Sequence, residues 1–141
     1  MQNSQTRILL VEDDAVLSEV IGRNLQARHY RVDVAYDGHT ALTFLRDNIF
    51  DLIFLDIDLP GHTGWEVLRI ASREGFLPAC INEAQRQVIP VVVLSAVRVS
   101  LERLAEFQLL AYLPKPFPME TLLRFASQAA IRNPSPPRKI V

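Results

Sequence analysis

Short apolar runs recur along the chain, and amphipathic segments separate them. The runs at 8–11, 52–55 and 91–94 each hold four consecutive apolar residues. Runs of this length and composition predict strands that are buried on both faces, as in a parallel sheet. The segment 31–35 instead alternates polar with apolar residues, which predicts a half-exposed strand at a sheet edge. A short fifth strand is predicted at 111–113.

Residues with helical spacing fill the intervals between these runs. The first such pattern starts at Ala15, and others lie at 41–45, 65–70, 101–107 and 118–129. In the first helix we expect a buried face formed by Val16, Leu17, Val20, Ile21 and Leu25, and an exposed face formed by Ser18, Glu19, Arg23, Asn24 and Gln26.

Five strands that alternate with five helices predict an α/β fold, because parallel neighbours need right-handed helical crossovers. The continuous apolar character of the first, third and fourth strands places them in the middle of the sheet. The polar second strand then belongs at an edge. This arrangement fits a doubly wound, flavodoxin-like sheet of five parallel strands in the order 2-1-3-4-5, with the five helices on both faces.

The length of 141 residues fits one domain with a single core. We expect this domain to cover residues 1–132, followed by a proline-rich tail or linker stub at 133–141. The interval 75–89 predicts either one or two helical turns or a surface loop, and no chemistry is assigned to it. Its Cys80 is the sole cysteine, which excludes an internal disulfide and fits a reducing compartment.

Charge and hydropathy exclude several classes of function. Fifteen basic and sixteen acidic residues give a formal net charge of -1, so nothing global draws the chain to nucleic acid or to an anionic membrane. The polar amino terminus precedes only four apolar residues, too few for a signal peptide or a membrane span. We therefore expect a cytoplasmic protein whose charge-driven chemistry is local.

Acidic residues follow two of the buried strands. Asp56 ends the third strand, and Glu12 and Asp13 follow the first, with Asp14 placed to cap the next helix. The carboxyl ends of parallel strands form the rim where ligands bind. With the strand order above, this rim should gather Glu12, Asp13, Asp56, Ser95 and Lys115.

Such a group of side chains suits phosphoryl transfer to oxygen. Crowded carboxylates repel one another unless a cation neutralises them, and two or three carboxylates suit octahedral Mg²⁺. An ammonium from Lys115 and a hydroxyl from Ser95 would neutralise and bind the equatorial oxygens of a phosphoryl group. Asp56 is then the nucleophile.

These residues resemble the receiver domain of two-component response regulators. The resemblance covers roughly residues 7 to 132, and four short motifs in the right order carry it: Glu12-Asp13, Asp56-Ile57-Asp58-Leu59-Pro60 with Gly64, Ser95-Ala96, and Lys115-Pro116-Phe117.

The resemblance implies a phosphoprotein of a phosphorelay rather than an enzyme with a separate substrate. Asp56 would accept phosphate from a sensor histidine kinase or a phosphotransfer protein. Asp13 and Asp56 would bind Mg²⁺, with help from the Asp58 backbone carbonyl and, through water, from Glu12. It also implies that the Lys115–Pro116 peptide bond is cis.

The resemblance further implies a conformational switch. Ser95 would move toward the phosphoryl group, and Tyr112, in the position of the family's switch aromatic, would turn inward. The responding surface, formed by the fourth helix, fifth strand and fifth helix, would bind an output partner or a second copy. Receivers that dimerise through charges there often carry an acidic pair where this chain has Leu109-Leu110-Ala111, so an apolar partner patch is the alternative.

Two other functions remain open at this point. A haloacid-dehalogenase-type phosphatase would also use Asp56-x-Asp58 with a serine and a lysine, but that family places the aspartate pair on its first strand. A degenerate receiver would act only as a docking module, and the retained acids, Ser95 and Lys115 argue against it. Turnover of a generic phosphomonoester with Mg²⁺ would favour the phosphatase.

Overall fold

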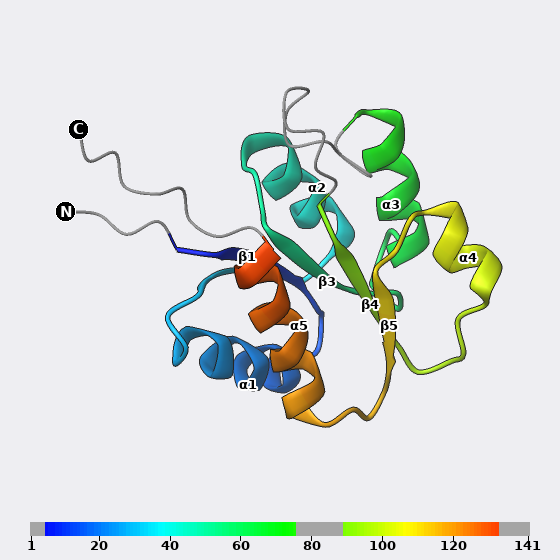
Figure 1. Ribbon diagram of the computed structural model, residues 1–141. Helices are drawn as coiled ribbons and strands as arrows, with labels where there is room; N and C mark the ends of the chain where they lie inside the picture. Colours follow the sequence, from blue (N-terminus) through cyan, green and yellow to red (C-terminus); the bar gives the residue numbers. More distant parts are fainter. Residues whose placement is uncertain (1–4, 76–88, 133–141) are drawn as a thin grey trace.

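A parallel sheet of five strands, in the order β2-β1-β3-β4-β5, runs through the middle of the fold (Figure 1). The computed structural model describes residues 5–75 and 89–132. The predictions for Cys80, for most of the interval 75–89 and for the tail at 133–141 lie outside these residues. In chain order the elements are β1 (Arg7–Val11), α1 (Ala15–Gln26), β2 (Arg31–Ala35), α2 (Gly38–Asp47), β3 (Leu52–Asp56), α3 (Gly64–Arg73), β4 (Val91–Ser95), α4 (Leu101–Glu106), β5 (Ala111–Pro114) and α5 (Met119–Arg132).

The predicted strand order is confirmed, and burial explains it. Every residue of β3 and β4 is buried, whereas β2 at the edge is mostly half-exposed. The register pairs Val11 with Leu55, Asp56 with Leu94, and Ser95 with Pro114. The carboxyl ends of β1, β3, β4 and β5 therefore lie along one rim.

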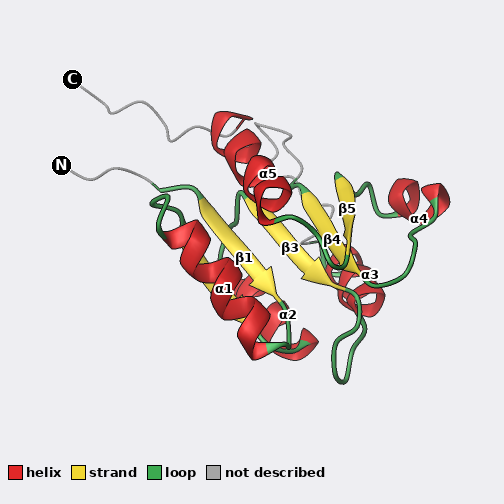
Figure 2. Cartoon of the chain, turned by 90° about the horizontal axis from the view of Figure 1, so that it is seen from below, coloured by secondary structure: helices red, strands yellow, loops and turns green. Residues whose placement is uncertain are grey.

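Helices cover both faces of the sheet, as Figures 1 and 2 show. Successive strand residues point to opposite faces, so Leu9 and Val11 join one core cluster and Ile8 and Leu10 join the other. The first cluster packs against α2 and α3, and the second against α1 and α5. Within the described part of the chain, no helix is long and apolar enough to cross a membrane.

Polar side chains cap the starts of α1 and α3. The Asp14 carboxylate accepts hydrogen bonds from the amides of Val16 and Leu17, both 3.0 Å, which confirms its expected role as the cap of α1. Thr63 and Glu66 form a reciprocal capping box at α3. These caps fix where each helix leaves the rim of the sheet.

The buried face of α1 differs from the expectation. Val16 and Val20 were expected inside, but their side chains are 73% and 43% exposed, while Ser18 is 1% exposed. The residues toward the sheet are Ser18, Ile21, Gly22 and Leu25, which follow the spacing i, i+3, i+4, i+7. Ser18 tolerates burial because its hydroxyl donates to the Ala15 carbonyl at 3.1 Å.

Helix α4 forms where helical spacing predicted it, but its apolar residues are not buried. Leu101, its first residue, is 82% exposed. No residue within α4 is buried, and the buried side chains of this region are Val99, just before the helix, and Phe107, just after it. A helix of six residues has too few turns to present a full apolar stripe, so its packing depends on neighbouring loop residues.

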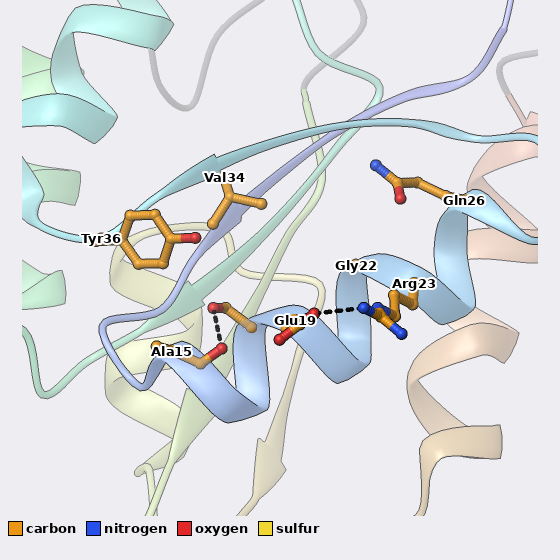
Figure 3. A pocket seen from close by; sticks show the side chains of 8 residues that line it. Ala15, Glu19, Gly22, Arg23, Gln26, Val34 and Tyr36 are labelled. Atoms are coloured by element: carbon orange, nitrogen blue, oxygen red, sulfur yellow. Dashed lines mark hydrogen bonds and ion pairs between the residues drawn. The ribbon is translucent and has the colours of Figure 1, made fainter.

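Two buried glycines at helices have opposite surroundings. Gly22 borders a groove between α1 and β2 that Val34 and Tyr36 also line (Figure 3), and a Cβ added there would meet nothing within 4 Å. At Gly64, the first residue of α3, a Cβ would lie 2.7 Å from the Asp56 carbonyl oxygen and from the Ile57 Cα. The second site therefore requires glycine for a close backbone approach.

We expect Gly22→Ala to stabilise the fold by about 0.5–1 kcal/mol, because alanine is the better helix former and has room there. Gly64→Ala should destabilise it by about 1–3 kcal/mol through overpacking against backbone. Urea denaturation of both variants measures the two effects. If both variants shifted the urea midpoint equally and in the same direction, the open space at Gly22 and the close backbone contact at Gly64 would be contradicted.

Candidate functional site

Three carboxylates meet at the rim of the sheet. Glu12 and Asp13 follow β1, and Asp56 ends β3, the neighbouring strand. Each of these residues offers a carboxylate oxygen that lies within 4.8 Å of those of the other two. Glu12 and Asp56 are 0% and 2% exposed, whereas Asp13 is exposed. The chain thus places two buried acids and one accessible acid around a common point.

Lys115 connects two of these acids. Its Nζ lies 2.9 Å from Glu12 Oε1 and 3.2 Å from Asp56 Oδ2. The Lys115 amide donates to the Ser95 carbonyl at 2.8 Å, which fixes the start of the loop after β5 against β4. The Lys115–Pro116 peptide bond is cis, as expected.

Burial and charge together set the protonation of this group. Burial, reinforced by the Asp56 carboxylate, raises the pKa of Glu12 to about 7, although the Lys115 ammonium and the Asp14 amide act in the opposite direction. Burial alone would lower the pKa of Lys115. Its contacts with Glu12 and Asp56 outweigh that effect and raise this pKa above its ordinary value. Lys115 therefore remains a cation at neutral pH.

The remaining oxygen of Asp56 is bound by the following loop. Asp56 Oδ1 accepts a hydrogen bond of 3.1 Å from the Asp58 amide. The Asp58 side chain itself is exposed. The Asp58 carboxylate therefore lies outside the group of carboxylate oxygens that Glu12, Asp13 and Asp56 form. The part expected of Asp58 concerns its backbone carbonyl, and that part stays a prediction.

Ser95 ends β4 with its hydroxyl already occupied. The Ser95 Oγ donates to the Val97 carbonyl at 2.6 Å and accepts from the Val97 amide at 3.1 Å. Ser95 and Val97 line a small cavity of about 150 Å³ together with Ile57, Asp58 and Ala96. Ser95 thus lies beside the loop that follows Asp56, but its hydroxyl points into its own turn.

The sequence interpretation did not identify Val97 as a partner of Ser95. A backbone carbonyl carries no residue signature, so only the tendency of serine to bond to backbone two residues away could have indicated it.

Tyr112 lies half-buried on β5, where it pairs in register with Val93. Its ring packs against the core cluster on the side of α2 and α3. This position agrees with a packed edge aromatic, and its expected role in switching stays a prediction.

The oxygen donors fit a hard divalent cation. Mg²⁺ prefers carboxylate oxygens and retains several waters, and an exposed acid such as Asp13 leaves one side of the group open to solvent. The group has neither the thiolate nor the imidazole ligands that softer metals prefer. The acidic group could therefore hold Mg²⁺.

Glu12 should make the metal-free protein less stable as the pH rises. Its pKa is about 7 in the folded chain and 4.5 ordinarily, so between these values the unfolded chain has released a proton that the folded chain retains. The free energy of unfolding therefore falls with increasing pH across this window and levels off above it.

The variant Glu12→Gln cannot titrate and should lack this part of the pH dependence. Urea denaturation in EDTA at a series of pH values, for wild type and variant, measures the difference. Parallel stability curves across the window would show that the pKa of Glu12 is not raised.

Comparisons with known proteins agree with these observations. The family model of the response regulator receiver domain matches residues 8–127. Response regulator ArlR of Staphylococcus saprophyticus is 33% identical over 120 residues, which cover 84% of this chain and 49% of ArlR. The chain thus spans about half the length of the curated relatives it matches.

Solved structures show the same architecture. The receiver domain of the Francisella response regulator 1452 has a TM-score of 0.75 at 25% identity, over 92% of this chain and 99% of that one. TrrA of Thermotoga maritima, solved in complex with Mg²⁺ and BeF, has a TM-score of 0.70 at 26% identity, over 89% of this chain and 99% of TrrA. Family match, relatives and fold lead to one conclusion: the chain belongs to the receiver domain family of two-component response regulators.

Proposed function

We propose that this receiver is a phosphorylation switch in which Asp56 accepts a phosphoryl group from a histidine kinase or a phosphotransfer protein. The observation that carries the proposal is the contact of one ammonium, Lys115, with the buried carboxylates of Glu12 and Asp56, beside the accessible Asp13. This arrangement sets an oxygen nucleophile next to a fixed positive charge, which phosphoryl transfer requires.

The transfer makes one bond and breaks another. A carboxylate oxygen of Asp56 attacks the phosphorus of a phosphohistidine, forming an O–P bond, while the P–N bond breaks and the imidazole of the donor takes up the electron pair and a proton. Asp13 and Asp56 would hold Mg²⁺, with the Asp58 carbonyl and, through water, Glu12 as further ligands. When bound, the cation would supply positive charge to the phosphoryl oxygens.

After transfer, the Lys115 ammonium would also neutralise the phosphoryl group on Asp56. The phosphoryl group adds about one unit of negative charge to Asp56, and the Lys115 Nζ, 3.2 Å from Asp56 Oδ2, is near enough to follow it. The Ser95 hydroxyl can bind a phosphoryl oxygen once it leaves the Val97 carbonyl. In doing so it would move the loop after β4.

That movement supplies the switch. Shifting an equilibrium from 1:99 to 99:1 takes about 5.5 kcal/mol of differential interaction, which a few charge-assisted hydrogen bonds can provide. Tyr112, half-buried next to β4, would respond by turning inward.

The output surface would be formed by α4, β5 and α5. Leu110, just before β5, is 38% exposed where charged receivers carry an acid, so an apolar partner or a second copy fits this surface better than a charged network. The match covers most of this chain but only about half of the relatives' own length. We therefore propose that residues 1–132 form the receiver and that 133–141 link it to an output module.

No observation favours the alternatives. A haloacid-dehalogenase-type phosphatase would carry its aspartate pair on the first strand, whereas Asp56 ends β3. A degenerate receiver would have no use for a lysine in contact with two buried acids.

Acetyl phosphate with Mg²⁺ should label the protein with one phosphoryl group, detected by intact mass, and EDTA should prevent the labelling. Asp56→Asn should abolish labelling, because the nucleophilic oxygen is lost. The matched control is Asp58→Asn, which changes an exposed side chain two residues away, keeps the backbone carbonyl and should still be labelled. Labelling that persists in Asp56→Asn would remove Asp56 from its role.

A further inference from the structure

Helix α4 is attached to the rest of the fold by few side chains. None of its six residues is buried, and Leu101 at its start is 82% exposed. Within the helix, Arg103 and Leu104 are half-buried and the other residues are exposed. Figures 1 and 2 show α4 at the β5 edge of the sheet, outside the layer that α2 and α3 form. What holds α4 in place must therefore lie at Arg103, Leu104 and the flanking segments, which bury Val99 before the helix and Phe107 after it.

Two stacked aromatic rings from α3 and the α4 region lie between two arginines. The guanidinium carbon of Arg103 lies 4.8 Å from the centroid of the Trp65 ring. Trp65 stacks on Phe107 with centroids 5.7 Å apart and an angle of 21° between the rings. The guanidinium carbon of Arg69 lies 5.9 Å from the centroid of Phe107. We call these four residues the α3–α4 stack; Trp65 and Arg69 belong to α3, Arg103 to α4, and Phe107 caps its end.

The two sides of the stack connect differently to the rim. On the α3 side, the Gly64 amide donates to the Ile57 carbonyl at 2.8 Å, and the close backbone approach at Gly64 leaves no room for a side chain. Trp65 is therefore fixed relative to Asp56. On the α4 side, Arg103 follows Ser95 by way of a loop that starts with the hydrogen bonds between Ser95 and Val97.

We propose that the α3–α4 stack holds α4 against α3 in the unphosphorylated chain, and that phosphorylation of Asp56 separates Arg103 from Trp65. The second half rests on the proposed function. When Ser95 leaves Val97 to bind a phosphoryl oxygen, the loop before α4 shifts while Trp65 stays with the Asp56 backbone. Arg103 keeps a charged partner after separation, because Glu106 lies 3.6 Å from its guanidinium.

Hydrogen exchange of the α4 amides, measured without phosphate, tests whether the α3–α4 stack holds α4 against α3. Arg103→Ala removes the cation above Trp65 and should speed exchange across 101–107 about two- to fivefold, the range that one exposed cation–π contact supplies. Arg103→Lys keeps a charge and a long side chain but loses the planar guanidinium, so it should show a smaller increase.

Two controls separate the stack from other effects. Arg98→Ala removes an exposed arginine from the loop before α4, and Glu106→Gln removes the ion pair while leaving Arg103 above the ring. Both should exchange like the wild type. Equal α4 exchange in Arg103→Ala and Arg98→Ala, or an equal increase in Glu106→Gln, would overturn the proposal.

The second half uses Trp65, the single tryptophan of the chain, as the reporter. After treatment with acetyl phosphate and Mg²⁺, we expect the wild type to gain the mass of one phosphoryl group. Acrylamide should then quench the Trp65 fluorescence more strongly, because the ring is more exposed. In Arg103→Ala, acrylamide should quench the Trp65 fluorescence this strongly even before labelling. A labelled protein with unchanged Trp65 accessibility would overturn the separation of the stack and leave the proposed function standing. A protein that takes up no label would overturn the proposed function and the separation with it, while the exchange data decide on the stack.

Discussion

One ammonium shared by two buried carboxylates is the interaction on which the site depends. Glu12 and Asp56 are almost fully buried at the rim of the sheet, and carboxylates this close destabilise each other unless a cation lies between them. Removing a charged group from water costs several kcal/mol, and only close, well-directed contacts offset that cost. The Lys115 ammonium contacts both acids, and a pKa of about 7 lets Glu12 keep a proton when neutralisation is incomplete.

The topology of the sheet explains why a lysine serves here. Neighbouring strands lie about 4.8 Å apart, so β5 lies roughly 10 Å from β3, with β4 between them. A long, flexible side chain is needed to cross the end of β4 from Lys115 to Asp56 and Glu12. The hydrogen bond from the Lys115 amide to the Ser95 carbonyl holds the starting point of that side chain. The order of the strands thus determines that the cation of the site comes from a residue with a long side chain, Lys115.

Much of the fold could be predicted from the sequence, because apolar runs report burial on both faces and the acids stand directly after them. The gathering of Glu12, Asp13 and Asp56 followed from strand order alone. Helix faces were harder to predict: hydrophobicity placed Val16 and Val20 inside, although both are exposed. The α1 face depends on which residues approach the sheet, and the six-residue α4 is too short for periodicity to indicate a face.

We propose that the rim of the sheet holds a phosphoryl group and a divalent cation at Asp56. A crystal structure of the protein with Mg²⁺ and beryllofluoride, a phosphoryl mimic, tests it most directly. We expect the mimic on a carboxylate oxygen of Asp56, Mg²⁺ bound by Asp13 and Asp56, and the Lys115 ammonium in contact with the mimic. Mg²⁺ bound away from these acids, or Lys115 still paired with Glu12 and turned from the mimic, would contradict it.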